Sequence, residues 1–124
     1  MVFTKKLCYT DSKGTFEPIN KEDIPMQLTV RQPSASEDAK HYTTERLRSE
    51  YLIETVFAPD DAILTYSHFD RIIAGGVMPV SKSVELVGCK ELASDTFLQR
   101  REMGVINIGG KGKIAVDGVE DDIK

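Results

Sequence analysis

The sequence predicts an all-β domain, and three observations lead to that prediction. Beyond Asp61, short segments rich in β-branched residues recur along the chain. Glycine, proline or aspartate separates them, at a spacing typical of a β-sandwich or barrel. Upstream, only one short segment has the pattern of a helix. We therefore expect a β domain preceded by one short N-terminal helix.

Length and charge restrict the function. The chain has 124 residues, enough for one domain, with 29% charged and 40% hydrophobic residues, the balance of a soluble globular protein. Its formal net charge is −4 and its pI is about 5.2. Because no strong basic field is present, we expect neither nucleic acid nor a membrane surface as a partner.

The sequence indicates a cytoplasmic location. The first fifteen residues contain no apolar run long enough for a signal peptide, and no later stretch is long enough to cross a bilayer. Cys8 and Cys89 are too few for a disulfide framework and lack CxxC spacing. We interpret them as two unrelated reduced thiols.

The N-terminal part divides into two segments. Residues 1–40 are rich in turn-forming residues and show no sustained period, so we expect them to be extended or irregular. Met26 opens "MQLTVRQPSASEDAKHY", and we expect residues 1–25 to be a leader or a disordered extension. Residues 26–60 are then an extended arm and a short helix, and residues 61–124 are the β domain.

The helix is predicted from about Thr44 to Val56. Thr43 or Thr44 can cap its N-terminus, and Glu45 follows in the first turn, where a negative charge suits the helix dipole. Pro59 is expected to end it. The apolar face of this helix would contain Leu47, Tyr51 and Leu52.

Five segments are predicted to form strands, and residues 89–102 remain ambiguous between a helical turn and a strand. The predicted strands are "AILTYS" (62–67), "DRIIAGGVMP" (70–79), "SVELVG" (83–88), "GVINIG" (104–109) and "KIAVDG" (113–118).

The glycine cluster in "INIGGKGKIAVDG" (106–118) suggests a phosphate loop, but its pattern is wrong for one. A P-loop requires Ser or Thr after Gly-Lys and then a helix, whereas Ile114 and further strand-like sequence follow here. We favour a hairpin whose turn glycines adopt positive φ. The turn would use Gly109, Gly110 or Gly112, with Ile106 and Ile108 paired against Ile114 and Val116.

Few residues suggest chemistry. His68 and Asp70 share one strand face, but two ligands without a third make a weak metal site, and His41 lies apart. We assign no catalytic residue and no metal ligand. Paired arginines can clamp a carboxylate through bidentate hydrogen bonds, although a solvated ion pair is the commoner role. The candidate substrate-binding residues are Arg71, Arg100 and Arg101.

Three stretches resemble a known enzyme family. They are "LRSEYLIETVF", "YSHFDRIIAGGVMPVSKSVEL" and above all "FLQRREMGVINIGGKGKIAVDG". From about Met26 onward the chain resembles 5-keto-4-deoxyuronate isomerase, also called 4-deoxy-L-threo-5-hexosulose-uronate ketol-isomerase, over the N-terminal half of that family. The resemblance implies two cupin-like β-barrels, of which this chain forms the first, and a homo-oligomer that is commonly a hexamer.

The resemblance also implies a reaction. Members of the family convert 5-keto-4-deoxyuronate, an acidic sugar from pectin and other polyuronides, to 3-deoxy-D-glycero-2,5-hexodiulosonate. This is a zinc-dependent aldose–ketose isomerisation, and the zinc ligands lie in the second barrel. No such histidine-rich segment occurs here, so we expect no zinc and no activity from this chain alone. The alternative is a non-catalytic cupin-like module that binds an acidic sugar.

Little sequence follows the predicted 104–118 hairpin, only "VEDDIK". We expect the barrel to be incomplete and the chain to be a truncated form. An open sheet edge favours association, so the isolated chain is expected to be marginally stable or oligomeric.

Overall fold

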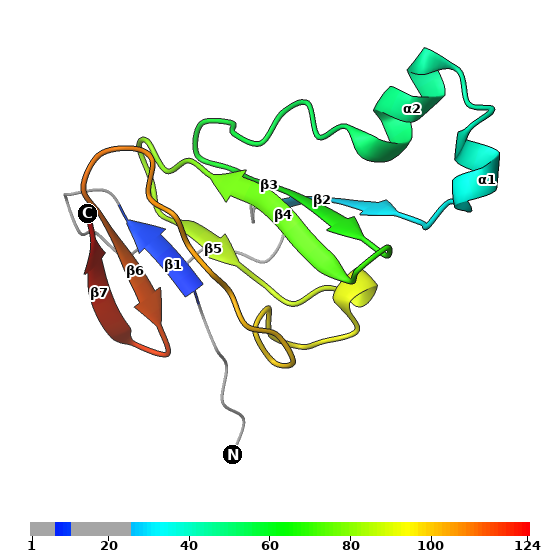
Figure 1. Ribbon diagram of the computed structural model, residues 1–124. Coiled ribbons are helices and arrows are strands. Elements are labelled where there is room, and N and C mark those ends of the chain that lie inside the picture. Colours follow the sequence, from blue (N-terminus) through cyan, green and yellow to red (C-terminus); the bar gives the residue numbers. More distant parts are fainter. Residues whose placement is uncertain (1–6, 11–25) are drawn as a thin grey trace.

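The protein is described here by a computed structural model that covers residues 7–10 and 26–124. These residues form mainly β-strands with a few short helices (Figure 1). The strands are β1 Leu7–Thr10, β2 Met26–Arg31, β3 Ala62–Ser67, β4 Ile72–Val77, β5 Val84–Leu86, β6 Gly112–Val116 and β7 Val119–Ile123. The helices are α1 Ser36–Ala39, α2 Thr44–Tyr51 and the 3-10 helix η2 Lys90–Leu92.

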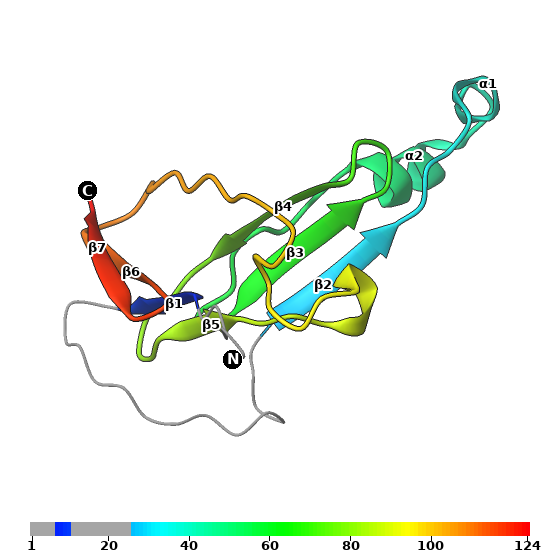
Figure 2. The same cartoon turned by 90° about the horizontal axis from the view of Figure 1, so that it is seen from below.

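The strands form two sheets that lie next to each other (Figures 1 and 2). One has the order β5-β1-β6-β7 and is antiparallel throughout. The other has the order β2-β3-β4, with β2 parallel and β4 antiparallel to β3. The described strands do not close into a barrel, but the predicted predominance of β structure is confirmed.

The central strand of the smaller sheet is β3, which has the bounds predicted for "AILTYS". Four of its six residues are buried, because β2 and β4 flank it and its inner face carries Ala62, Leu64 and Tyr66. A strand covered on both edges and on one face is buried more completely than its neighbours. The inner face of β3 is therefore the part of the smaller sheet that packs into the hydrophobic core.

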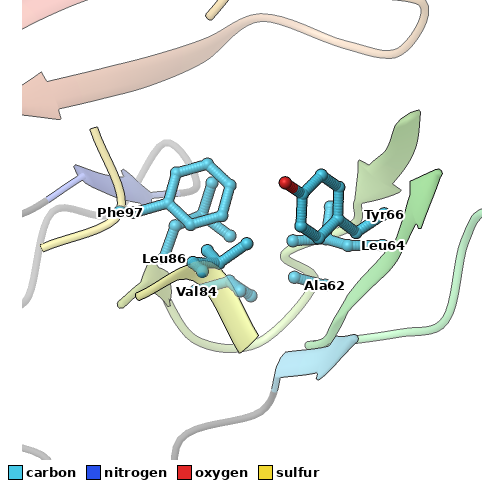
Figure 3. Close-up of a cluster of buried hydrophobic side chains, with 7 residues drawn as sticks. Ala62, Leu64, Tyr66, Val84, Leu86 and Phe97 are labelled. Atoms are coloured by element: carbon cyan, nitrogen blue, oxygen red, sulfur yellow. The ribbon is translucent and has the colours of Figure 1, made fainter. Parts of the chain in front are cut away.

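A hydrophobic core joins the two sheets. Side chains from β3 face side chains from β5 and the ring of Phe97 across the space between the sheets (Figure 3). Val84 on β5 is almost completely buried, and Leu92 of η2 packs into the same cluster. Removal of this apolar area from water is the main favourable contribution to the folding of the domain. The full cluster is Ala62, Leu64, Tyr66, Val84, Leu86, Leu92 and Phe97.

Two glycines let β4 approach its neighbours closely. A Cβ at Gly75 would lie 2.0 Å from the backbone oxygen of Ile63 on β3. A Cβ at Gly76 would lie 2.4 Å from the backbone oxygen of Val56, in the segment between α2 and β3. Neither oxygen belongs to a flexible side chain, so only glycine fits at these two positions.

The predicted helix is present but ends earlier than expected. The hydroxyl of Thr43 accepts a hydrogen bond from the N–H of Arg46 at 3.3 Å, as the N-cap prediction required. The predicted end near Val56 and Pro59 was wrong, because Leu52 is already extended. The carbonyl of Leu52 accepts a hydrogen bond from Arg31 Nη2 at 2.7 Å, which ties this end of α2 to β2. No residue of α2 is buried, so its apolar face lies partly exposed.

The predicted 104–118 hairpin is also wrong in its register. Residues 104–109 form no strand, and the hairpin joins β6 to β7 instead. Its turn contains Asp117 and Gly118, with φ of 52° and 82°, the backbone of a type I′ turn that favours Asp-Gly. Gly109, Gly110 and Gly112 do not adopt positive φ. The strand-forming pattern of 104–109 lacks a partner strand among the described residues.

Part of the N-terminal segment lies within the fold. β1 falls inside residues 1–25 and pairs with both β5 and β6. The other residues of that segment lie outside the described part, and the leader stays a prediction. Among the described residues, no helix has the length and apolar character needed to span a membrane.

Substitution of Gly75 by alanine is expected to destabilise the domain by about 3 kcal/mol, because strand β3 would have to move away from β4. Thermal unfolding followed by circular dichroism measures the change. Gly104→Ala is the matched control, since a Cβ there meets no atom within 4 Å. Equal melting temperatures for Gly75→Ala and Gly104→Ala would contradict the close packing of β3 and β4.

Candidate functional site

An apolar groove of about 940 Å³ lies between the two sheets. β4 and β5 form its walls, and residues 101–110 border it along one side. Apolar lining with a few polar groups is the usual character of a small-molecule site. Its apolar lining includes Ile73, Val77, Val84, Leu86, Phe97 and Ile114.

Arg101 is the most constrained charged residue of the groove. Its Nη2 donates a hydrogen bond to the carbonyl of Leu92 at 3.3 Å, and its guanidinium carbon lies 5.5 Å from the ring centroid of Tyr66. Its Nη1 is buried and has no hydrogen-bond partner among the described residues. A buried charged donor without an acceptor is unfavourable, so this guanidinium is suited to an anionic ligand.

The other two candidate arginines differ in position. Arg71 lines the same groove, on the turn between β3 and β4, with a left-handed φ of 53°. Arg100 is exposed and does not line the groove. The structure thus brings Arg71 and Arg101 to one groove, which we call the arginine site, and leaves Arg100 outside it. Glu102 also lines the groove, so an anion there would meet both signs of charge.

The described residues do not form a metal site. No group of three or more His, Cys, Asp or Glu side chains with a geometry suited to a metal ion occurs in the part of the chain that the structure describes. The ring of His68 packs on Tyr66 with centroids 4.5 Å apart. The residues that the structure describes therefore do not fit the zinc ion implied by the family resemblance.

Cys89 is not suited to nucleophilic chemistry. Burial raises the pKa of its thiol, and the neighbouring Glu91 adds to that rise. The thiolate is the reactive form of cysteine, so a raised pKa disfavours a nucleophilic role for this side chain.

Asp60 organises the rim of the groove. Its Oδ1 accepts hydrogen bonds from the backbone N–H groups of Val80 and Ser81, each at 2.7 Å, and of Lys82 at 3.2 Å. Its Oδ2 accepts one from the hydroxyl of Ser81 at 2.6 Å. These bonds, led by the one from the Ser81 hydroxyl, hold the pKa of the Asp60 carboxyl well below its usual range. No local sequence pattern identifies Asp60, because its hydrogen-bond partners lie twenty or more positions away.

Comparison with known proteins confirms the resemblance seen in the sequence. The chain is 50% identical over 97 residues to 4-deoxy-L-threo-5-hexosulose-uronate ketol-isomerase 2 of Enterococcus faecalis, covering 78% of this chain and 35% of that protein. It is 54% identical over 98 residues to a 4-deoxy-L-threo-5-hexosulose-uronate ketol-isomerase from Salmonella newport. This match covers 77% of this chain and 35% of that protein. The chain is also 50% identical over 91 residues to the ketol-isomerase of the same name from Lachnoclostridium phytofermentans, and the match covers 73% of this chain and 33% of that protein. The chain thus spans about a third of the length of these relatives. No protein-family model matches the sequence.

Replacement of Asp60 by asparagine is expected to destabilise the domain at pH 7. The lowered pKa of Asp60 means that its carboxylate contributes stability above its ordinary pKa of 3.8 and loses that contribution as the pH falls below this value. The gap between the urea midpoints of wild type and variant should therefore shrink between pH 7 and pH 2.5. Asp70→Asn is the control, because no described residue donates a hydrogen bond to this exposed carboxylate. A gap of equal size at both pH values would contradict the assignment.

Proposed function

We propose that this chain is part of a ketol-isomerase that acts on 4-deoxy-L-threo-5-hexosulose-uronate, in the breakdown of pectin and other polyuronides. The observation that carries the proposal is an identity of about 50% to several proteins of that name over roughly three quarters of the chain. Identity at this level over about a hundred residues supports shared ancestry and a shared role.

The contribution of this chain is structural rather than catalytic. Aldose–ketose isomerisation moves a proton between neighbouring carbons, so it needs an acid or base and a group that stabilises the enediolate oxygen. The described residues present neither a metal-ligand cluster nor an activated nucleophile. We infer that the zinc ion and the catalytic residues belong to the part of the relatives' length that this chain does not match.

The proposed architecture is part of a cupin-like barrel. Two sheets that border a shared apolar groove and do not close are consistent with an incomplete barrel. We further propose that the protein is a homo-oligomer, a hexamer as the resemblance implies. We place it in the cytoplasm.

A second candidate function is the binding of an acidic sugar without turnover. The observation that favours it is the buried, unpartnered Nη1 of Arg101 beside a groove that Arg71 also lines. A sugar carboxylate would supply the missing acceptor, and its carbon skeleton would pack on the apolar lining of the groove, such as Ile73 and Phe97. For this candidate function, the arginine site binds and orients the sugar without converting it to a product.

The first proposal predicts that a protein of the relatives' length containing this sequence isomerises the uronate substrate, whereas the purified 124-residue chain does not. A coupled assay of product formation, run at equal molar concentrations, measures both. Turnover by the 124-residue chain would refute the structural role, and absence of turnover by the longer protein would refute the family activity.

The second candidate predicts that the chain binds D-galacturonate and that Arg101→Gln weakens the affinity by roughly tenfold to a hundredfold, because one charge-assisted hydrogen bond to the carboxylate is lost. Isothermal titration calorimetry measures the dissociation constants. Arg100→Gln is the matched control, since Arg100 lies outside the groove. Equal losses in the two variants, or no saturable binding by the wild type, would exclude this candidate.

A further inference from the structure

Residues 104–109 have the sequence of a strand without the structure of one. The segment "GVINIG" is rich in β-branched residues, yet it contains no strand. The backbone of residues 104–106 and 108 makes no hydrogen bond to any described residue. Only the end of the segment is held locally: Asn107 Nδ2 donates to the carbonyl of Gly110 at 2.8 Å, and Asn107 Oδ1 accepts from the N–H of Gly109 at 3.1 Å.

The same segment exposes its apolar side chains. Ile106 is 87% exposed and Ile108 is 75% exposed, the largest values among the large hydrophobic residues of the described part. Exposed isoleucine is unfavourable in water, and the backbone beside it, which no described strand pairs with, is free to accept another strand. A strand from elsewhere would satisfy both, as in recognition by β-strand addition.

The small core points to the same conclusion. In the described part of the chain, eight hydrophobic residues are buried while thirteen large hydrophobic residues are exposed. Several of the exposed ones, including Ile72, Met78 and Val80, line the apolar groove that residues 104–109 border. The groove and the segment therefore form one continuous apolar surface that these residues do not cover themselves.

Charge argues against a second copy of this segment as the partner strand. Arg100 and Arg101 precede the segment, and Lys111 and Lys113 follow it. In parallel self-pairing each of these cations would lie opposite its own copy, which is destabilising. In antiparallel self-pairing centred on the segment, Arg100 would lie opposite Lys113, although Glu102 would face Lys111. A different strand, with neutral or acidic flanks, suits the segment better.

We propose that residues 104–109 form a strand that pairs with an extended apolar segment of the remaining polypeptide, whose side chains fill the groove. The inference rests on the proposed function, because the relatives are about three times as long as the part that this chain matches. The remaining two thirds of such a protein supply an intramolecular partner at high effective concentration. The partner is recognised by its backbone and by apolar side chains at alternate positions.

Hydrogen–deuterium exchange tests the pairing. We would compare the 124-residue chain with a chimera in which this chain replaces the matching third of the Enterococcus faecalis relative, and with that relative itself at the aligned peptide. The amides of residues 105–108 are expected to exchange at least tenfold more slowly in the long proteins. Equal rates in the short and long proteins would overturn the proposal. Slowing in the 124-residue chain as its concentration rises would also overturn it, because the partner would then be a second copy.

A matched pair of variants separates pairing from general stability. In the chimera, Ile106→Asp is expected to restore fast exchange at residues 105–108, because a carboxylate cannot enter the apolar groove. Val119→Asp, at an exposed apolar position on β7, is expected to leave that exchange slow. Slow exchange in both variants would refute the role of Ile106. The measurement does not depend on turnover, so failure of the isomerase assay and failure of the pairing are distinct results.

Discussion

The contact between β3 and β5 is the interaction on which the rest of the structure depends. The two sheets share no hydrogen-bonded strand pair among the described residues, so side-chain packing is the main contact between them. Leu64 and Tyr66 on one side meet Leu86 and Phe97 on the other (Figure 3). Close packing makes such a contact sensitive to the loss of even one methylene group. The groove, its arginines and the rim held by Asp60 all take their positions from it.

The arginine site depends on this core directly. Tyr66 contributes its ring to the hydrophobic cluster and also faces the guanidinium of Arg101 and the ring of His68. Leu92, another core residue, accepts the hydrogen bond from Arg101 through its carbonyl. The cation is thus held by groups that cannot move without disturbing the core. A preorganised guanidinium pays little conformational entropy when it meets an anion, which is the physical basis of the binding candidate.

Local signals in the sequence predicted the structure well, and signals that depend on distant partners did not. The strand "AILTYS" and the cap at Thr43 follow from patterns within a few residues, and both are present. The segment 104–109 has the right propensity, but a strand also requires a neighbour to pair with, and sequence pattern does not show whether one exists. The Asp117–Gly118 turn was detectable from the Asp-Gly pair alone, although the neighbouring glycine cluster drew the prediction away from it. Arg71 and Arg101 were recognised as residue types, whereas their common groove arises only from the tertiary fold.

The strand pairings have a consequence for the order of folding. β2 and β3 pair in parallel with Met26 opposite Ala62, and β1 pairs with β5 and β6 through Leu7 opposite Leu86 and Val116. In each of these pairs the two strands are separated by a long stretch of chain, which must be synthesised before they can pair. In the β3–β4 and β6–β7 hairpins the paired strands are neighbours in the sequence. Distant pairings close large loops and fold slowly. The β3–β4 hairpin can therefore form before the larger antiparallel sheet, whose strands β6 and β7 are the last to be synthesised, and apolar faces stay open to aggregation until that sheet is complete.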